Sequence, residues 1–453
     1  MPESHNFEFP ADFLWGAATS AYQIEGSPLA DGAGPSIWHR FSHCPGATEL
    51  GATGDIACDH YRRSREDVQL MRQLGLNAYR FSISWSRVFA SGRGNLNRPG
   101  LDFYDRLVDD LLAHGITPMA TLYHWDLPAA LDEHGGWLNR DIAGWFADYA
   151  SAVVRALGDR VALWTTLNEP WVVSDAGYLH GVHAPGHHSI FEAPLASHNL
   201  LRAHGAGVQA IRAAGGKEVG LVVNLEPKVA ATDHPDDVAA TRRADAYMNR
   251  QFLDPVFLGR YPEELRAIFG EAWPDFPGED FALIQEPIDF LGINYYTRNV
   301  TCHDPTAAAP LFVGRVRQEH HTYTALDWEV YPPALTDVLI WVRDRYGRVP
   351  CYITENGAAF DDAPTAAGEV VDDPLRTAYF RDHLRAAHEA IERGVDLRGY
   401  FAWSLLDNFE WSAGYTKRFG LYHVDFATQK RTPKASASFY ADVIRTGGRA
   451  LGH

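Results

Sequence analysis

The chain has 453 residues, 46% of them hydrophobic and 22% charged, which is the composition of a globular protein with a sizeable buried core. Its formal net charge of −18 disfavours nucleic acids and anionic membranes as partners, because both attract basic surfaces. Residues 1–5 resemble no signal peptide, and no run of about 18 apolar residues predicts a membrane span. A cytoplasmic location is therefore expected.

Short apolar stretches that end in polar side chains predict the strands of this chain. In chain order they cover residues 13–19, 77–85, 116–123, 161–167, 218–225, 288–293, 350–357 and 399–406. Between them, apolar residues recur every three or four positions and glycine often follows the last, which predicts helices. The predicted helices cover residues 66–74, 101–114, 142–157, 197–214, 237–252, 333–345 and 374–393.

Strands that alternate with helices form parallel sheets, because the helices supply the crossovers. Eight strands in this order favour an α/β fold of the (β/α)8 TIM-barrel type over an open doubly wound sheet. The open sheet would require a Gly-rich phosphate loop after an early strand, and none is evident. No repeat or linker divides the chain, so we expect a single domain over residues 1–453. Long loops at residues 302–324 and 361–373 are expected on the C-terminal face of the strands.

Two of the predicted strands end in a glutamate. Asn168 and Glu169 follow one apolar stretch and precede Pro170, which stops the strand. Glu355 ends another apolar stretch, shortly before a turn at Gly357. Paired carboxylates are suited to acid–base or nucleophilic chemistry, whereas two unrelated surface glutamates are the commoner outcome. The other strand ends decide between these interpretations.

In a barrel, the C-terminal ends of all the strands meet at one mouth. The residues expected there are Gln23, Arg80, His124, Asn168, Glu169, Asn294, Tyr296, Glu355, Trp403, Glu410 and Trp411. Amides bind hydroxyl groups and aromatic faces cover C–H surfaces, so the predicted ligand is a neutral sugar. No phosphate cradle and no Ser–His–Asp order is present, and two carboxylates are the apparatus for cleaving a glycosidic bond.

Some of these side chains have a structural alternative. Arg80 could belong to a buried ion pair, and His124 could be a core histidine, although its place at a strand end favours the site. Three tryptophans are interpreted as packing residues: Trp85, Trp125 and Trp164. Two further carboxylates near the strand ends are interpreted as structural: Asp126 and Asp407.

Metal and disulfide sites are not expected. The four cysteines have no close paired spacing, which argues against a disulfide framework or a structural zinc site. The nearest approach to a histidine cluster is the loop with His180, His183, His187 and His188. The strand ends carry their His, Asn and Glu residues singly, so we expect neither a catalytic metal nor an organic cofactor.

Eight short motifs together closely resemble the signatures of glycoside hydrolase family 1, the β-glucosidases. They are residues 13–19, 22–26, 79–85, 123–126, 166–170, 294–296, 353–357 and 403–411. The resemblance extends from about Phe7 to about Ile444. Eight motifs in the family's order are far more specific than any one of them.

The resemblance implies a retaining exo-β-glycosidase that hydrolyses terminal β-D-glucosyl residues of cellobiose and of aryl and alkyl β-glucosides, and also β-galactosides and β-fucosides. Glu169 would be the acid/base and Glu355 the nucleophile, kept charged by Arg80 and Tyr296. The implied sugar contacts are Gln23, His124, Asn168, Asn294, Tyr296, Trp403, Glu410 and Trp411, with Trp328 beside the leaving group. The alternative is a barrel of the same fold that binds sugar without turnover. A homo-oligomer is left open.

Overall fold

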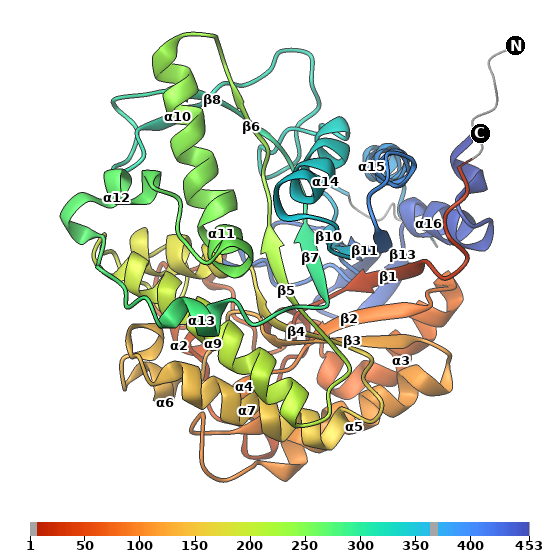
Figure 1. The fold of residues 1–453 in the computed structure, drawn as a ribbon. Coiled ribbons are helices and arrows are strands. Elements are labelled where there is room, and N and C mark those ends of the chain that lie inside the picture. The colour runs from red at the N-terminus through yellow and green to blue at the C-terminus, as the bar shows by residue number, and fades with distance from the viewer. Residues whose placement is uncertain (1–6, 363–369, 453) are drawn as a thin grey trace, which may run out of the picture.

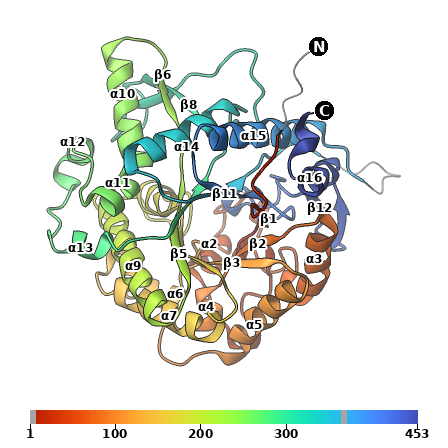
Figure 2. The same cartoon turned by 45° about the vertical axis from the view of Figure 1, so that its right-hand side comes forward.

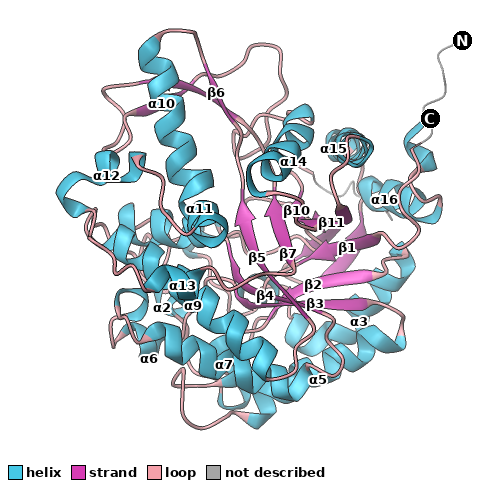
Figure 3. Cartoon of the chain, viewed as in Figure 1, coloured by secondary structure: helices cyan, strands magenta, loops and turns pink. Residues whose placement is uncertain are grey.

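The computed structural model describes residues 7–362 and 370–452. At its centre, eight parallel strands close into a barrel (Figures 1 and 3). Around the barrel the order is β1-β11-β10-β7-β5-β4-β3-β2. The strands are β1 (Leu14–Ala18), β2 (Ala78–Ser82), β3 (Thr117–Tyr123), β4 (Leu163–Asn168), β5 (Glu218–Asn224), β7 (Phe290–Asn294), β10 (Cys351–Asn356) and β11 (Leu397–Trp403). The predicted (β/α)8 barrel is confirmed, and the open sheet is excluded.

Helices surround this barrel (Figure 2). The longer ones are α3 (His60–Leu74), α5 (Arg98–Ala113), α7 (Ile142–Leu157), α9 (Glu192–Ala213), α10 (Pro235–Asp245), α11 (Gln251–Leu258), α14 (Pro333–Tyr346), α15 (Pro374–Glu392) and α16 (Ala435–Arg445). The short ones are α1 (Ala21–Ile24), α2 (Ile37–Ser42), α4 (Trp85–Val88), α6 (Ala129–Asp132), α8 (Pro170–Val172), α12 (Glu264–Phe269) and α13 (Asp280–Ile284). No helix among the described residues is both long and apolar enough to cross a membrane.

The apolar character of the strands follows from their burial on both faces. One face packs under the outer helices. Side chains from the other faces of seven strands form a separate apolar cluster of the barrel strands: Ala18, Ala78, Met119, Leu163, Phe290, Tyr352 and Phe401. Such filling makes the barrel a packed core, so a ligand can enter only at the mouth.

The helix boundaries differ from prediction where solvent-facing residues hide the pattern. The prediction for α7 is correct to the residue. The helix α3 begins at His60, six residues before the predicted start, because its first turns are rich in arginine and lack the apolar repeat. The predicted helix 237–252 is interrupted by a π-helical segment, Ala246–Arg250. The helix α16 was not predicted.

The loops hold two small sheets that the sequence did not indicate. One consists of β6 (Lys228–Ala230), β8 (Asn299–His303) and β9 (Val313–Arg315), so the loop expected at 302–324 is partly regular. The other pairs β12 (Tyr422–Asp425) with β13 (Lys430–Pro433). Most of the second expected loop, 361–373, lies outside the described residues.

Candidate active site

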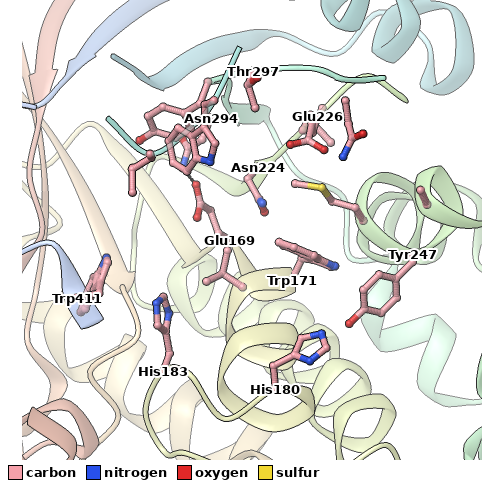
Figure 4. Close-up of a pocket in the computed structure, with 18 of the residues that line it drawn as sticks. Glu169, Trp171, His180, His183, Asn224, Glu226, Tyr247, Asn294, Thr297 and Trp411 are labelled. Atoms are coloured by element: carbon pink, nitrogen blue, oxygen red, sulfur yellow. Dashed lines mark hydrogen bonds between the residues drawn. The ribbon is translucent and has the colours of Figure 1, made fainter. Parts of the chain in front are cut away.

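A cavity of about 590 Å³ opens at the C-terminal end of the barrel strands (Figure 4). Nine of the predicted site residues line it: His124, Glu169, Asn294, Tyr296, Trp328, Glu355, Trp403, Glu410 and Trp411. Three others, Gln23, Arg80 and Asn168, are buried and do not line the cavity. They contact residues that do, so the strand ends converge on one site.

Glu355 lies on β10 and is held by a cation and a hydroxyl. Arg80 Nη1, from β2, donates to its Oε1 at 2.6 Å. Tyr296 Oη donates to the other oxygen, Oε2, at 2.6 Å. Burial raises the pKa of Glu355, while the Arg80 charge and the Tyr296 hydrogen bond oppose that rise.

Glu169 follows β4 directly and has a different environment. Its Oε1 accepts a hydrogen bond from Asn294 Nδ2 at 2.6 Å, and no Lys or Arg among the described residues forms an ion pair with it. Burial, and then the charge of Glu355, raise the pKa of Glu169 to about 8. At neutral pH, therefore, Glu169 retains its proton, whereas Arg80 and Tyr296 favour the ionised form of Glu355.

Asn168 connects the two carboxyls. Its Oδ1 accepts from Arg80 Nη2 at 2.7 Å and from Asn294 Nδ2 at 3.1 Å. Its Nδ2 lies 3.1 Å from His124 Nε2, and because an amide nitrogen can only donate, that ring nitrogen accepts. The pKa of His124 is well below its usual value through burial and the nearby Arg80. The neutral ring therefore carries its hydrogen on Nδ1, which has no partner among the described residues and is free to bind a ligand hydroxyl.

Gln23 contacts the segment that brings Glu410 to the cavity. Its Nε2 donates to Phe409 O at 2.9 Å and lies 3.4 Å from Glu410 Oε2. Burial and the charge of Glu355 raise the pKa of Glu410 to about 8, so this carboxyl can donate as well as accept.

Aromatic rings form much of the remaining wall. His124 stacks near-parallel to Trp403 at 6.0 Å between ring centroids, and Tyr296 lies 5.2 Å from Trp328. Trp125, interpreted as a packing residue, is buried in the core, and it also lines the cavity, with its ring 4.6 Å from that of Trp411.

Three cavity residues have an unusual backbone conformation. The φ angles are 44° at Glu169, 78° at Trp125 and 49° at Trp411. This left-handed region is unfavourable for residues with a side chain, and such strain concentrates at functional sites. The conformation is consistent with a site whose geometry is imposed by the surrounding fold.

The outer part of the cavity was not predicted. Figure 4 shows Trp171, His180, Asn224, Glu226 and Tyr247 around it, and Lys228 also lines it. Lys228 pairs with Glu226, and Tyr247 Oη donates to Asp175 Oδ1 at 2.7 Å. Asn224 ends the fifth strand, so the rule that found the other strand ends could have found it. Tyr247 comes from the irregular helix after that strand and had no such signal.

Neither of the two carboxylates interpreted as structural lines the cavity, and Asp126 is buried. Asp407 forms ion pairs with Lys434 at 2.7 Å and with Arg418 at 2.8 Å, away from the cavity lining. His180 lies 3.6 Å from Asp175, and His187 lies 2.7 Å from Glu192. In the described part of the chain, the loop that carries these histidines contributes to no group of three metal-ligand side chains.

A barrel mouth with one protonated and one ionised carboxyl, surrounded by amides and aromatic rings, defines a glycoside hydrolase site. The family model "Glycosyl hydrolase family 1" matches residues 5–449. The chain belongs to glycosyl hydrolase family 1, and as a member it is a retaining β-glycoside hydrolase. The alternative of a sugar-binding barrel without turnover is not favoured.

Individual relatives agree with this assignment. Beta-glucosidase A of Thermotoga maritima is 49% identical over 445 residues, covering 97% of this chain and 98% of the relative. The bifunctional beta-D-glucosidase/beta-D-fucosidase of Bifidobacterium breve is 44% identical, covering 96% and 98%. A solved structure of the family 1 β-glucosidase from Thermotoga maritima has a TM-score of 0.95 at 48% identity, covering 98% of this chain and 100% of that one.

Proposed function

We propose that this chain is an exo-acting β-glucosidase in which Glu355 is the nucleophile and Glu169 the acid/base. It removes terminal non-reducing β-D-glucosyl residues from cellobiose and from aryl and alkyl β-glucosides. The observation that carries the proposal is the difference between the two carboxyls: Glu355 alone pairs with a buried arginine, and the pKa of Glu169 is raised to about 8. This difference supplies an ionised nucleophile and a protonated acid at the same pH.

In the first step, a carboxylate oxygen of Glu355 attacks the anomeric carbon while Glu169 protonates the leaving oxygen. The bond to the aglycone breaks and a glycosyl ester of Glu355 forms. As the charge of Glu355 is used in this bond, its electrostatic effect on Glu169 disappears, and the pKa of Glu169 falls. Glu169 is thereby suited to act as a base in the next step.

In the second step, Glu169 takes a proton from water, which attacks the same carbon and releases Glu355. Two displacements retain the anomeric configuration. An alcohol in place of water would yield a new glycoside, so transglycosylation is an expected side reaction. Arg80 and Tyr296 stabilise Glu355 as the departing carboxylate.

The sugar would occupy the inner part of the cavity. Proposed contacts from the cavity lining are His124, Asn294, Tyr296, Trp403, Glu410 and Trp411, with Trp328 toward the leaving group. Gln23 and Asn168 are proposed as contacts from the family resemblance, and both are buried directly behind the lining. The outer part, around Glu226 and Lys228, would receive the aglycone. We also propose activity on β-galactosides and β-fucosides. In support, one relative carries fucosidase in its name, and a Thermotoga maritima structure holds galacto-hydroximolactam.

The test is phenol release from an aryl β-D-glucoside by Glu355→Gly, with and without azide. We expect an inactive variant that azide restores, with α-glucosyl azide as the product, because azide then attacks in place of the nucleophile. Glu169→Gly with azide should give the β-azide instead, after the ester has formed. Glu226→Gly, which removes a cavity carboxylate outside the pair, is the matched control and should need no azide. A wild-type enzyme that binds the sugar without turnover would refute the proposal.

The extent of the catalytic domain, the cellular location of the protein and its oligomeric state remain proposals. The single family match over residues 5–449 supports one catalytic domain across residues 1–453. The cytoplasmic location, the homo-oligomer and a role in cellulose breakdown stay predictions. Cell fractionation, light scattering and assays on cello-oligosaccharides would test them in turn.

A further inference from the structure

A group of two histidines and one aspartate lies outside the active site, beside the short helix α2. The ligand atoms of His39, His43 and Asp55 all lie within 4.8 Å of one another. No other group of three such side chains occurs in the described ranges, 7–362 and 370–452. We propose that these three residues bind a divalent transition-metal ion, such as Zn²⁺, through both Nε2 atoms and the Asp55 carboxylate.

The distances fit such an ion. His43 Nε2 is 3.1 Å from Asp55 Oδ2, and His39 Nε2 is 3.9 Å from Asp55 Oδ1. In a tetrahedral zinc site with bonds of about 2.0–2.1 Å, two ligand atoms lie about 3.3 Å apart. The observed distances fall on either side of this value, so small side-chain rotations would complete the site.

The hydrogen bonding of His43 favours a cation between it and Asp55. Its Nδ1 lies 2.6 Å from the carbonyl oxygen of His39, which can only accept, so Nδ1 carries the hydrogen. In the neutral ring, Nε2 therefore presents a lone pair to a carboxylate oxygen 3.1 Å away. A metal ion at this point would bind the ring nitrogen and the carboxylate oxygen together. The backbone carbonyl on Nδ1 is also the partner that orients metal-binding histidines.

The local structure fixes the three ligands. His39 lies in α2 and His43 is the residue that caps its C-terminus in a helical conformation, so the two, four residues apart, face the same side. The first turn of α2 is capped by Ser36 Oγ at 3.1 Å from His39 N. The Asp55 segment is anchored by its own carbonyl oxygen, which accepts from Ser27 N at 2.7 Å. The ligands therefore come from two separately anchored segments, and the ion would cross-link them.

The charge and exposure of the group are also suitable. The side chains of His43 and Asp55 are 43% and 45% exposed, so an ion can enter and water can complete its coordination. Arg40, the nearest cation on the helix, is directed to Glu133 at 2.6 Å. Two imidazole ligands select Zn²⁺, Co²⁺, Ni²⁺ or Cu²⁺ rather than Mg²⁺ or Ca²⁺, which prefer oxygen.

The proposed metal site lies behind one wall of the active-site cavity, the wall that contains Trp411. Trp38, next to His39 in the sequence, is fully buried, and its ring lies 4.6 Å from that of Trp411. An ion on the outer side of α2 therefore holds the helix whose inner side supports Trp411. We expect binding to stabilise the folded protein without entering the catalytic cycle.

The experiment is calorimetric titration of the chelator-treated full chain with ZnCl₂ at about pH 7.5, together with melting curves and the visible absorption of bound Co²⁺. We expect one ion per chain and a melting temperature that rises with the zinc concentration. Loss of an outer partner of a metal ligand already lowers affinity about 10–100-fold, so His43→Gln and Asp55→Asn should each lower it at least about 100-fold. The Co²⁺ spectrum should disappear with the affinity.

Two controls separate this site from others. His134→Ala removes an exposed histidine outside the group and should leave zinc affinity unchanged. Glu355→Gly should also bind zinc normally, which excludes the catalytic carboxyls as the ligands. Both ligand variants should keep wild-type aryl-glucosidase activity, which shows that they are folded. Unchanged zinc affinity in folded His43→Gln and Asp55→Asn, or no binding by wild type, would overturn the proposal.

Discussion

Replacing Glu169 with Gln tests the assignment of the acid most directly. The amide has the same shape as the carboxyl, and its oxygen can still accept the 2.6 Å hydrogen bond from Asn294. What is lost is the proton for the leaving group. General acid catalysis raises the rate by about 10²–10⁴-fold, which corresponds to a lowering of the activation free energy by about 3–5 kcal/mol.

The effect should depend on the leaving group. Methyl β-glucoside, whose alkoxide leaves poorly, should lose about 10²–10⁴-fold in kcat/KM. A dinitrophenyl glucoside needs little protonation, and its kcat/KM should fall far less. The assay is initial-rate kinetics on both substrates with the same enzyme preparations.

The dependence of kcat/KM on pH gives a second quantitative test of Glu169 as the acid. Because the pKa of Glu169 is about 8, about nine tenths of the wild-type enzyme carries the proton at pH 7 and about one tenth at pH 9. The acid works only when protonated, so wild-type kcat/KM should fall as pH rises through about 8, and this limb should be missing in Glu169→Gln. If the basic limb persisted in the variant, or both substrates slowed equally, the reasoning would be refuted.

Three further outcomes are expected. Tyr296→Phe removes a hydrogen bond that lowers the pKa of Glu355, so the acidic limb of the pH–kcat/KM profile should move to higher pH. Glucosides with a 6-phosphate should be hydrolysed more slowly than plain glucosides in paired assays, because Lys228 is the only Lys or Arg among the described lining residues and is already paired. Lys434→Met leaves buried Asp407 without its ammonium partner, and urea unfolding should show a loss of about 3–5 kcal/mol. Since the pKa of Asp407 is lowered in the folded state, its stabilisation is present above the unfolded pKa and is lost as pH falls.

The barrel was predictable because its strands are largely buried on both faces and each ends in, or is directly followed by, a polar residue. Those two features are local, and they survive in a single sequence. The starts of helices were harder to predict: α3 begins with a polar, arginine-rich segment, which resembles a loop in composition. The small sheets depend on pairing between distant segments such as β6 and β8, for which no local pattern exists.

The same distinction holds for the site. Residues within a few positions of a strand end, such as Glu169, Asn294 and Glu355, were found because the barrel brings those ends together. Tyr247 reaches the cavity from a helix, which depends on tertiary packing. The same holds for the proposed metal site. The four-residue spacing of His39 and His43 is visible in the sequence, but the position of Asp55 beside them depends on the fold.

The left-handed backbone at Glu169, Trp125 and Trp411 has a consequence for protein engineering. Such a conformation costs about 1–3 kcal/mol at a residue with a side chain and almost nothing at glycine. At Trp125 and Trp411, which are buried, the lost packing of the indole ring costs about 3–5 kcal/mol and outweighs this relief. At Glu169, a selection that rewards heat resistance alone would favour glycine and would enrich inactive enzymes. Improved variants of this barrel need a screen that scores turnover and survival together, because at its mouth the two demands oppose each other.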